Sequence, residues 1–414
     1  MSNLSVNNNM KQNNLKATMV AVAVALVVCA TSLAGCGSNE KAGQDDSTDV
    51  AGTYARIEIP AAVRALEPDG KWYADTIYDA GDKVYYFAYV EDLPRSVIYV
   101  GDSVLLESSG IELFWPEEHG SRFGVATVGR SVMVDFADSK SVEQLATLVD
   151  KPSGFTRYRK TQVADFGNLV LYSHEVDYPD RTVTHGQEIT RWLTNLMLVR
   201  NAPVQRQTIW PGYIVYRYDY GNGLPYRGNA SDKEALADFL THCYFDTVKA
   251  DYGSNIEDYP AELYSNLSLR AVACNDRYVT YYLYTNDYLG GAHGYYTERL
   301  ISYDPIHRQE IDWQYLFKPQ SVEAVMRLVE SVAERSEEYN YWNACINGGL
   351  DVYDNQGELT DEKELPDIGL SREGVVFSFQ PYEIACFAAG TMHFTVPYKA
   401  LEPYLTDRAR WCLQ

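Results

Sequence analysis

Strand-like and helix-like segments alternate along this chain without the regular strand–helix–strand repeat of a parallel α/β fold. Runs such as 84–90 and 212–218 gather apolar residues over a short length, alternating in places, which predicts strands. Apolar residues at helical spacing follow Thr184, Ser231 and Ser321, which predicts helices. This mixture favours an α+β fold, with an antiparallel sheet that carries helices on one face in the C-terminal unit, preceded by a smaller β-rich domain.

Two short motifs are typical of helix starts. Ser141 precedes Gln144 by three residues, and Ser231 precedes Glu234 by three. This is the capping-box spacing, in which the hydroxyl and the later acid or amide each accept a hydrogen bond from an N–H that the helix leaves unpaired. We therefore expect Ser141 and Ser231 to be N-cap residues.

The length of 414 residues suggests two or three domains of roughly 100–200 residues each. Residues 53–160 hold strand-like runs and turns, and we interpret them as a β-rich domain of unknown role. Residues 161–414 form the α+β unit. Residues 36–52 are small and polar, which indicates a flexible tether.

Residues 1–35 are organised like a bacterial lipoprotein signal peptide. Lys11 and Lys16 charge the segment before an apolar run at 17–30, and this run is shorter than the ~20 residues that a helix needs to cross a bilayer. Leu33-Ala34-Gly35-Cys36 follows, a lipobox pattern in which small residues precede the cysteine that is acylated. We predict cleavage before Cys36 and attachment of its thiol to the bilayer by lipid. An ordinary secretory signal and a short N-terminal anchor are the alternatives.

The predicted location is therefore the bacterial cell envelope, lipid-anchored and outside the cytoplasm. The chain has 57 acidic and 35 basic residues, a formal charge of −22. This excess argues against nucleic acid as a partner, because phosphate binding needs a basic face. It would favour a basic partner protein, although a solvated acidic coat explains the same charge.

Five cysteines remain after Cys29 in the signal and Cys36 in the lipobox. Their spacing forms no CxxC pair and no zinc-ligand set. Two disulfides with one thiol left over, or buried free thiols, both fit an exported protein. The pairing stays open for Cys243, Cys274, Cys345, Cys386 and Cys412.

Motifs of known catalytic chemistry are absent from the sequence: it has no Walker loop, no GxGxxG, no GxSxG and no HExxH. The seven histidines are isolated, so we expect no metal and no cofactor. The acidic run at 351–367 lacks the register of an EF-hand. It is interpreted as a solvated loop, with a docking surface for a basic protein as the alternative.

A glycine-rich segment follows the strand that we expect to end near Tyr288. Gly290, Gly291 and Gly294 permit a tight hairpin, and this accounts for the glycines without any function. The functional alternative places His293 at the tip or floor of a cleft. Tyrosines crowd the neighbouring strands, where strand propensity alone explains them.

Three segments carry a resemblance to a known family. Tyr288–Gly294, Asp312–Phe317 and Gly374–Ala385, the last including Tyr382, resemble the extracellular domain of the lysozyme-sensing anti-sigma factor RsiV. The same region is found ahead of the catalytic domain in certain peptidoglycan deacetylases. The resemblance covers about 165–414 and implies a module displayed outside the membrane that binds a protein or a cell-wall partner.

No catalytic residue is implied by this resemblance, because the metal-binding motifs of the deacetylase domain are absent. The leading hypothesis is a non-enzymatic envelope lipoprotein that binds lysozyme-like proteins or a cell-wall component. The alternatives are a glycan- or peptidoglycan-binding module that uses the tyrosines, and a hydrolase with a site near His293. The candidate binding residues are Tyr288, Gly290, Gly291, His293 and Tyr382.

Overall fold

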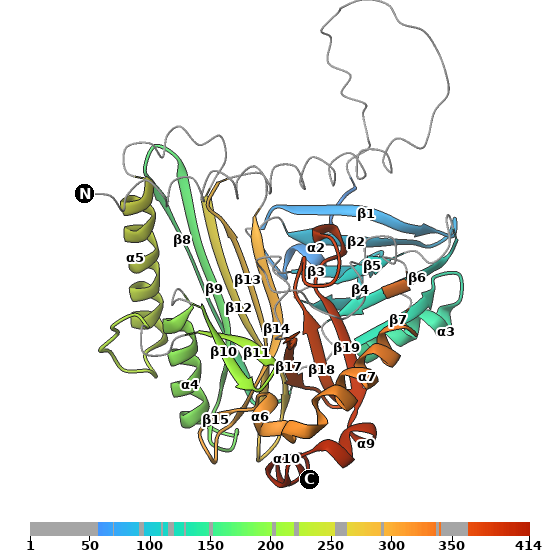
Figure 1. The fold of residues 1–414 in the computed structure, drawn as a ribbon. Helices are drawn as coiled ribbons and strands as arrows, with labels where there is room; N and C mark the ends of the chain where they lie inside the picture. The colour runs from blue at the N-terminus through green and yellow to red at the C-terminus, as the bar shows by residue number, and fades with distance from the viewer. Residues whose placement is uncertain are drawn as a thin grey trace, which may run out of the picture. The chain divides into compact units, whose positions relative to one another are not determined.

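The computed structural model describes 57–68, 70–90, 95–108, 111–114, 120–127, 130–148, 152–200, 204–218, 223–252, 263–290, 294–336, 339–340 and 363–414 (Figure 1). The segment Ile57–Gln414 is one compact unit. The predicted signal peptide at 1–35 and the tether at 36–52 lie outside the described residues, as do Gly291, His293 and Cys345. None of the helices in the described ranges combines the length and the apolar character needed to span a bilayer.

Two small antiparallel sheets make up the N-terminal part of the unit. Their strand orders are β1-β2-β3-β4 and β5-β6-β7. Tyr99 and Phe136 are among the fully buried side chains that fill their cores. The elements are α2 (Ala61–Arg64), β1 (Trp72–Asp79), β2 (Val84–Val90), β3 (Ser96–Val100), β4 (Ser103–Ser108), β5 (Glu112–Phe114), β6 (Arg122–Thr127), β7 (Arg130–Asp135), α3 (Ser139–Val142) and the 3-10 helix η1 (Glu143–Leu148).

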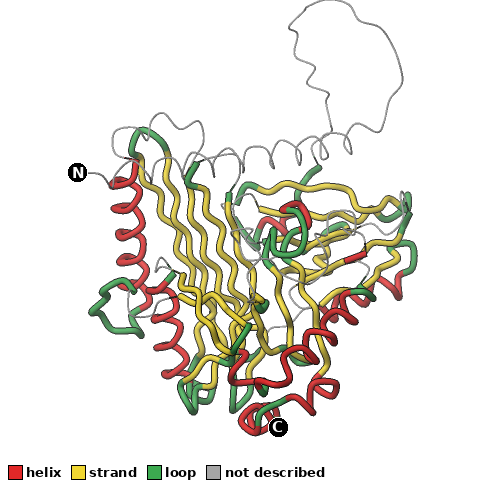
Figure 2. Tube along the Cα trace, viewed as in Figure 1, coloured by secondary structure: helices red, strands yellow, loops and turns green. Residues whose placement is uncertain are grey.

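A six-stranded sheet forms the centre of the unit, with strand order β15-β14-β13-β12-β9-β8. Its strands are labelled in Figure 1, and strands are yellow in Figure 2. Its neighbours pair antiparallel except for β9 and β12, which pair in parallel. The strands are β8 (Phe155–Asp165), β9 (Leu169–Pro179), β12 (Leu263–Cys274), β13 (Val279–Tyr288), β14 (Tyr295–Asp304) and β15 (Gln309–Glu310). Strand β8 runs across the predicted domain boundary at 160/161, because it pairs along its whole length with β9.

Two helices cover one face of this sheet, α4 (Gly186–Val199) and α5 (Lys233–Tyr252). Ile189, Leu193, Leu236 and Leu240 recur at helical spacing and pack into one core with side chains of the sheet such as Tyr281. This burial explains why the amphipathic segments after Thr184 and Ser231 are helical. The α+β class with helices on one face of a largely antiparallel sheet is confirmed.

The two predicted N-caps were wrong by a small register shift. In α5, Asp232 accepts a hydrogen bond from the Ala235 N–H at 3.0 Å, so Asp232 takes the place predicted for Ser231. In α3, Asp138 is the N-cap and accepts from the Lys140 N–H at 3.0 Å, while Ser141 already lies inside the helix. Both errors have one cause, because aspartate caps as well as serine does and lies closer to the true helix start.

The C-terminal part adds a second layer to the central sheet. The sheet β17-β18-β19 packs against β14, and a separate sheet has the order β10-β11-β16. A large apolar core that includes Trp313 and Phe377 lies beneath the helices of this part. The elements are β10 (Val204–Trp210), β11 (Tyr213–Tyr218), α6 (Trp313–Leu316), η4 (Pro319–Ser321), α7 (Val322–Ala333), β16 (Lys363–Glu364), β17 (Asp367–Leu370), β18 (Gly374–Phe379), η6 (Phe387–Ala389), β19 (Met392–Pro397), α9 (Tyr398–Leu401), η7 (Glu402–Tyr404) and α10 (Asp407–Leu413).

A cluster of ion pairs, the arginine–carboxylate cluster, joins the N-terminal part to the central sheet. Arg95 lies 2.8 Å from Glu107 and 3.0 Å from Glu175 of β9, and its side chain is only 7% exposed. Breaking such a buried pair by removing one partner costs roughly 3–5 kcal/mol. The cluster contains Arg95, Arg157, Arg159 and Arg270 together with Glu67, Glu107, Glu175 and Asp177.

The four cysteines within the described residues carry free thiols. Cys412 is buried, and Cys243, Cys274 and Cys386 are half-buried. Burial raises the pKa of the Cys274 and Cys412 thiols to about 11, with smaller contributions from neighbouring side chains. These two thiols are therefore poor nucleophiles at neutral pH.

Candidate functional site

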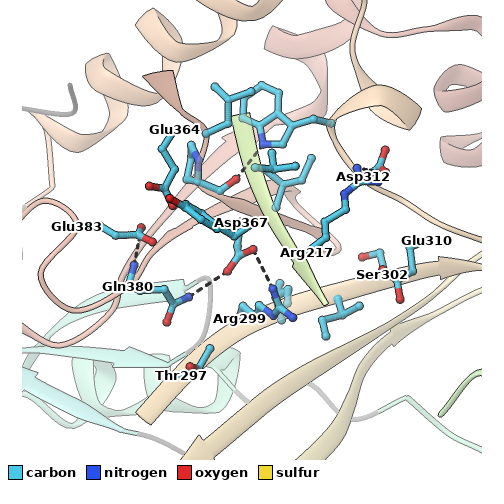
Figure 3. A pocket seen from close by; sticks show the side chains of 18 of the residues that line it. Arg217, Thr297, Arg299, Ser302, Glu310, Asp312, Glu364, Asp367, Gln380 and Glu383 are labelled. Atoms are coloured by element: carbon cyan, nitrogen blue, oxygen red, sulfur yellow. Dashed lines mark hydrogen bonds and ion pairs between the residues drawn. The ribbon is translucent and has the colours of Figure 1, made fainter. Parts of the chain in front are cut away.

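A pocket of about 430 Å³ lies where the central sheet meets the C-terminal layer (Figure 3). Strand β14 forms one wall, and β11 with the β15–α6 segment forms a second. The third wall comes from β16, β17 and the turn that follows β18. The pocket's charged side chains are Arg217, Arg299, Glu310, Asp312, Glu364, Asp367 and Glu383.

Gln380 connects the walls of this pocket. Its amide nitrogen donates to the backbone oxygen of Glu298 on β14 at 2.8 Å and to Asp367 Oδ2 at 3.3 Å. Its amide oxygen accepts from the Glu298 N–H at 3.2 Å. Arg299 Nη1 lies 3.0 Å from Asp367 Oδ1, so Asp367 is held from two sides, as Figure 3 shows.

Glu383 is a carboxyl group of this pocket whose pKa departs strongly from the usual value for glutamate. Its Oε2 accepts a hydrogen bond from the Gln380 N–H at 2.8 Å. Burial, followed by repulsion from Asp367 and Glu364, raises the pKa of Glu383 well above its usual range. The cause is the low-dielectric surroundings combined with nearby negative charge, both of which disfavour the ionised form.

The carboxylates of the opposite wall are held by an ion pair and by hydrogen bonds from a backbone N–H and an indole N–H. Asp312 pairs with Arg217 and also caps α6, accepting from the Tyr315 N–H at 2.8 Å. Glu310 accepts from the indole nitrogen of Trp192 at 3.1 Å. Each of these carboxylates therefore has a position defined by protein groups.

This arrangement is suited to hold a cation. The five carboxyl groups of the pocket outnumber its two arginines, and each arginine is paired with one carboxylate. A positively charged ligand group would offset the excess of carboxyl groups in the pocket and favour ionisation of Glu383. Within the described ranges, no group of three or more His, Cys, Asp and Glu side chains is placed to hold a metal ion.

Nucleophilic chemistry is poorly supported by the hydroxyl groups near this pocket. Ser302 lines it but is 1% exposed, and its oxygen accepts from the Leu370 N–H at 2.8 Å. A Ser-His-Glu line lies nearby, with His393 Nδ1 2.9 Å from Ser378 Oγ and Nε2 3.8 Å from Glu298. Ser378 is fully buried inside β18, so a substrate cannot reach its oxygen.

Tyr288, Gly290 and Tyr382, the sequence-predicted binding residues that the structure describes, do not line this pocket. Tyr288 ends β13 and packs on Tyr264, with ring centroids 5.8 Å apart, against the core under α4 and α5. Gly290 has a φ of 92°, which fits the tight turn expected there. Gly291 and His293 lie outside the described residues, so their predicted role is untested.

Tyr382 is the predicted binding residue whose two neighbours in sequence line the pocket. It is 55% exposed and has a left-handed φ of 74°, which is rare for a residue with a bulky side chain. Its neighbours Pro381 and Glu383 line the pocket, and Tyr295 at the pocket is 63% exposed. Exposed tyrosines therefore lie beside the carboxylates, although Tyr382 itself packs on Phe387 outside the lining.

Sequence reasoning missed most of the charged residues of this pocket. Glu364 and Asp367 belong to the acidic run interpreted as solvated, yet Glu364 is only 8% exposed. Glu383 lies within the segment Gly374–Ala385 that carries the family resemblance, which was a usable signal. Arg217 and Arg299 stand in ordinary strand sequence, and no local pattern distinguishes them.

No curated protein matches the chain. A member of the DUF3298 family from Bacteroides fragilis NCTC 9343 has a similar solved structure, with 15% identity and a TM-score of 0.46, over 63% of this chain and 96% of that one. A DUF3298 family protein from Pseudomonas aeruginosa PAO1 gives 13% identity and a TM-score of 0.40, over 63% and 97%. Residues 316–399 match the family model described as "Protein of unknown function (DUF3298)". The chain therefore contains a DUF3298 domain at 316–399, the segment that supplies β16, β17 and the Gln380–Glu383 turn of the pocket.

Proposed function

We propose that this chain is a lipid-anchored protein of the bacterial envelope that binds a basic protein through the carboxylate-lined pocket. In this proposal Cys36 carries the anchor, residues 36–52 are the tether and the α+β unit is the binding module. The surplus of carboxyl groups in the pocket carries the proposal, since a lysine or arginine side chain of a partner would complete it. Lysozyme-type proteins are the candidate partners, in line with the resemblance to RsiV.

Charge at two scales supports the same type of partner. The chain as a whole carries −22, which attracts a basic protein over a distance set by the salt concentration. The pocket then offers Glu310 and Glu364 near the two arginine–carboxylate pairs that are already formed. Exposed Tyr295 and Tyr382 add flat amphipathic surface of the kind that is enriched at protein interfaces.

The test is the affinity of the purified full chain for lysozyme, measured by calorimetry at rising salt. We expect binding that weakens as salt rises, because the screening length falls from about 10 Å at 0.1 M to about 3 Å at 1 M. Glu310→Gln with Glu364→Gln removes two charges, and we expect the affinity to fall by about tenfold. Glutamine at 310 keeps an acceptor for the Trp192 indole.

Glu323→Gln with Glu330→Gln is the matched control, since it also removes two charges. Both residues lie exposed on α7 and do not line the pocket, so this variant should bind as the parent does. Absence of lysozyme binding at low salt would remove the lysozyme proposal. Equal loss in the pocket variant and the control would show that net charge acts without the pocket.

A glycan- or peptidoglycan-binding module is the second candidate, favoured by the exposed rings of Tyr295 and Tyr382. Stacking of a sugar on a tyrosine ring is not screened by salt. Sedimentation with purified sacculi that persists at high salt, without binding to lysozyme, would therefore replace the first proposal by this one. A hydrolase centred on His293 has no support in the described residues, where the Ser378 hydroxyl is inaccessible.

A further inference from the structure

A second pocket adjoins the first and has the opposite character. It has a volume of about 700 Å³ and is bordered by α4, β10, β11 and the turn between β14 and β15. Arg217, Glu310 and Asp312 line both pockets, so the two cavities meet at these residues. The acidic pocket and this second pocket therefore share a wall that contains these three side chains.

Arginines outnumber carboxylates in the second pocket. Its four arginines are Arg191, Arg206, Arg217 and Arg308, and its three carboxylates are Glu188, Glu310 and Asp312. Arg191 Nη1 and Arg308 Nε both approach the same Oε2 oxygen of Glu188, Arg308 at 3.3 Å. One negative charge is thus shared by two guanidinium groups, and each guanidinium has five N–H donors. The side chain of Arg308 is 69% exposed, so its remaining donors are accessible.

The turn that carries Arg308 is fixed from inside the protein. Arg308 has a left-handed φ of 57°, which is uncommon for a residue other than glycine. The fully buried Asp304 holds the turn by accepting from the Ile306 and His307 N–H groups, each at 2.9 Å, and from the Tyr315 hydroxyl at 2.7 Å. Such a conformation persists only where the surroundings impose it, and it is concentrated at functional sites.

The floor of the second pocket is also rigid. Trp192 stacks on Tyr303 with ring centroids 4.6 Å apart, and both residues are only 5% exposed. These rings support the pocket without offering a face on which a sugar could stack. The polar lining is completed by four side-chain amides, which present a donor and an acceptor as a peptide group does: Asn195, Gln205, Gln207 and Gln309.

We propose that the second pocket binds an acidic peptide, with its arginines on the carboxylates and its amides on the peptide groups. Arginine matches a carboxylate through two parallel hydrogen bonds, which gives both affinity and orientation. The proposal is independent of lysozyme binding, because it concerns a ligand of the opposite charge and depends on Arg191, Arg206 and Arg308, which line the second pocket and not the first. It adds an anion-binding function to a chain of strong net negative charge.

Calorimetry of the full chain in detergent micelles tests this with tetraglutamate as the probe. We expect tetraglutamate to bind and tetraglutamine and tetralysine not to bind at this pocket. Two further probes distinguish the alternatives. Binding of inorganic phosphate would indicate a general anion site, and binding of an oligogalacturonate would indicate an acidic-sugar site. Failure of tetraglutamate to bind, or equal binding of phosphate or oligogalacturonate, overturns the proposal.

Arg308→Gly locates the binding on the second pocket without endangering the fold. Glycine adopts a φ of 57° freely, so the melting temperature should stay equal or rise. We expect the affinity for tetraglutamate to fall about tenfold, the usual effect of losing a charged hydrogen-bond donor. Arg327→Gln on α7, 69% exposed and outside both pockets, is the matched control and should bind as the parent does. Unchanged affinity in both Arg308→Gly and Arg191→Gln contradicts the assignment.

Discussion

A single carboxyl group shows how the acidic pocket depends on its charge balance. Glu383 is half-buried and belongs to the same wall of the pocket as Asp367 and Glu364, while the Arg299 guanidinium is engaged by Asp367. The pKa of Glu383 is therefore raised, first by burial and then by its two acidic neighbours. A carboxyl group placed where ionisation is unfavourable is a feature typical of functional sites.

Glu383→Gln should make the protein more stable at alkaline pH and leave it unchanged at acid pH. In the unfolded chain Glu383 ionises near 4.5, whereas the folded state keeps its proton to higher pH. Between these two pKa values the folded state binds more protons, so the free energy of unfolding falls as pH rises. Glutamine removes this loss and still accepts from the Gln380 N–H. Urea unfolding of the parent and of Glu383→Gln at about pH 4 and about pH 8 measures the free energy of unfolding. If the two proteins were equally stable at both pH values, the raised pKa would be contradicted.

Strand β17 is the element that brings the C-terminal layer close to the central sheet. A Cβ added at Gly369 would lie 2.3 Å from Leu300 Cβ and 2.9 Å from the Leu300 backbone carbonyl. The absence of a side chain at this position therefore allows β17 to lie directly on β14. Asp367 and Ile368 of the same strand line the pocket, so the position of the pocket wall depends on this contact.

Gly369→Ala should destabilise the fold by roughly 1–3 kcal/mol, the usual cost of overpacking a tight contact. Gly120→Ala is the matched control, because its added Cβ would meet only the Arg122 nitrogen at 3.8 Å. The control should be neutral or slightly stabilising. Thermal unfolding of both variants measures the difference. Equal melting temperatures would show that β17 can move away from β14 at no cost.

The sequence predicted elements better than it predicted their assembly. Strand β2 has the bounds of the predicted run at 84–90, and β11 begins one residue after the start of the predicted run at 212–218, because apolar patterning is a local property that a few residues carry. The pocket combines residues from 196 to 383 that become neighbours only through the pairing of β14 with β13 and the packing of β17 on β14. No local pattern encodes such long-range contacts, which explains why Tyr288 was chosen while Arg299 and Asp367 were missed.

The described part of the whole molecule is held together by charge as well as by apolar cores. The arginine–carboxylate cluster links Glu67 and Arg95 of the N-terminal part to Arg157, Glu175 and Arg270 of the central sheet. Its members lie in strands and turns that are far apart in sequence. We expect the N-terminal part and the central sheet to be strongly coupled, because separating them would leave several buried charges without partners.

Attachment of the whole molecule to a membrane depends on one thiol in the proposed function. Cys36→Ala should abolish metabolic labelling with palmitate and release the protein from the membrane fraction, because the lipid has no other predicted attachment point. Cys243→Ala is the matched control, since it removes a half-buried thiol within α5 and should leave labelling intact. Undiminished labelling of Cys36→Ala would contradict the lipoprotein assignment.

The arginine–carboxylate cluster also bears on the electrostatic interaction between copies of this protein. It contains equal numbers of the two signs, yet the chain has only 35 basic residues against 57 acidic ones. Because the four arginines and four carboxylates of the cluster cancel, the remaining charged residues carry the whole net charge of −22, and acidic groups are a larger share of them. Neighbouring molecules crowded on one surface would therefore repel each other, which favours a spaced array of separate copies over lateral clusters.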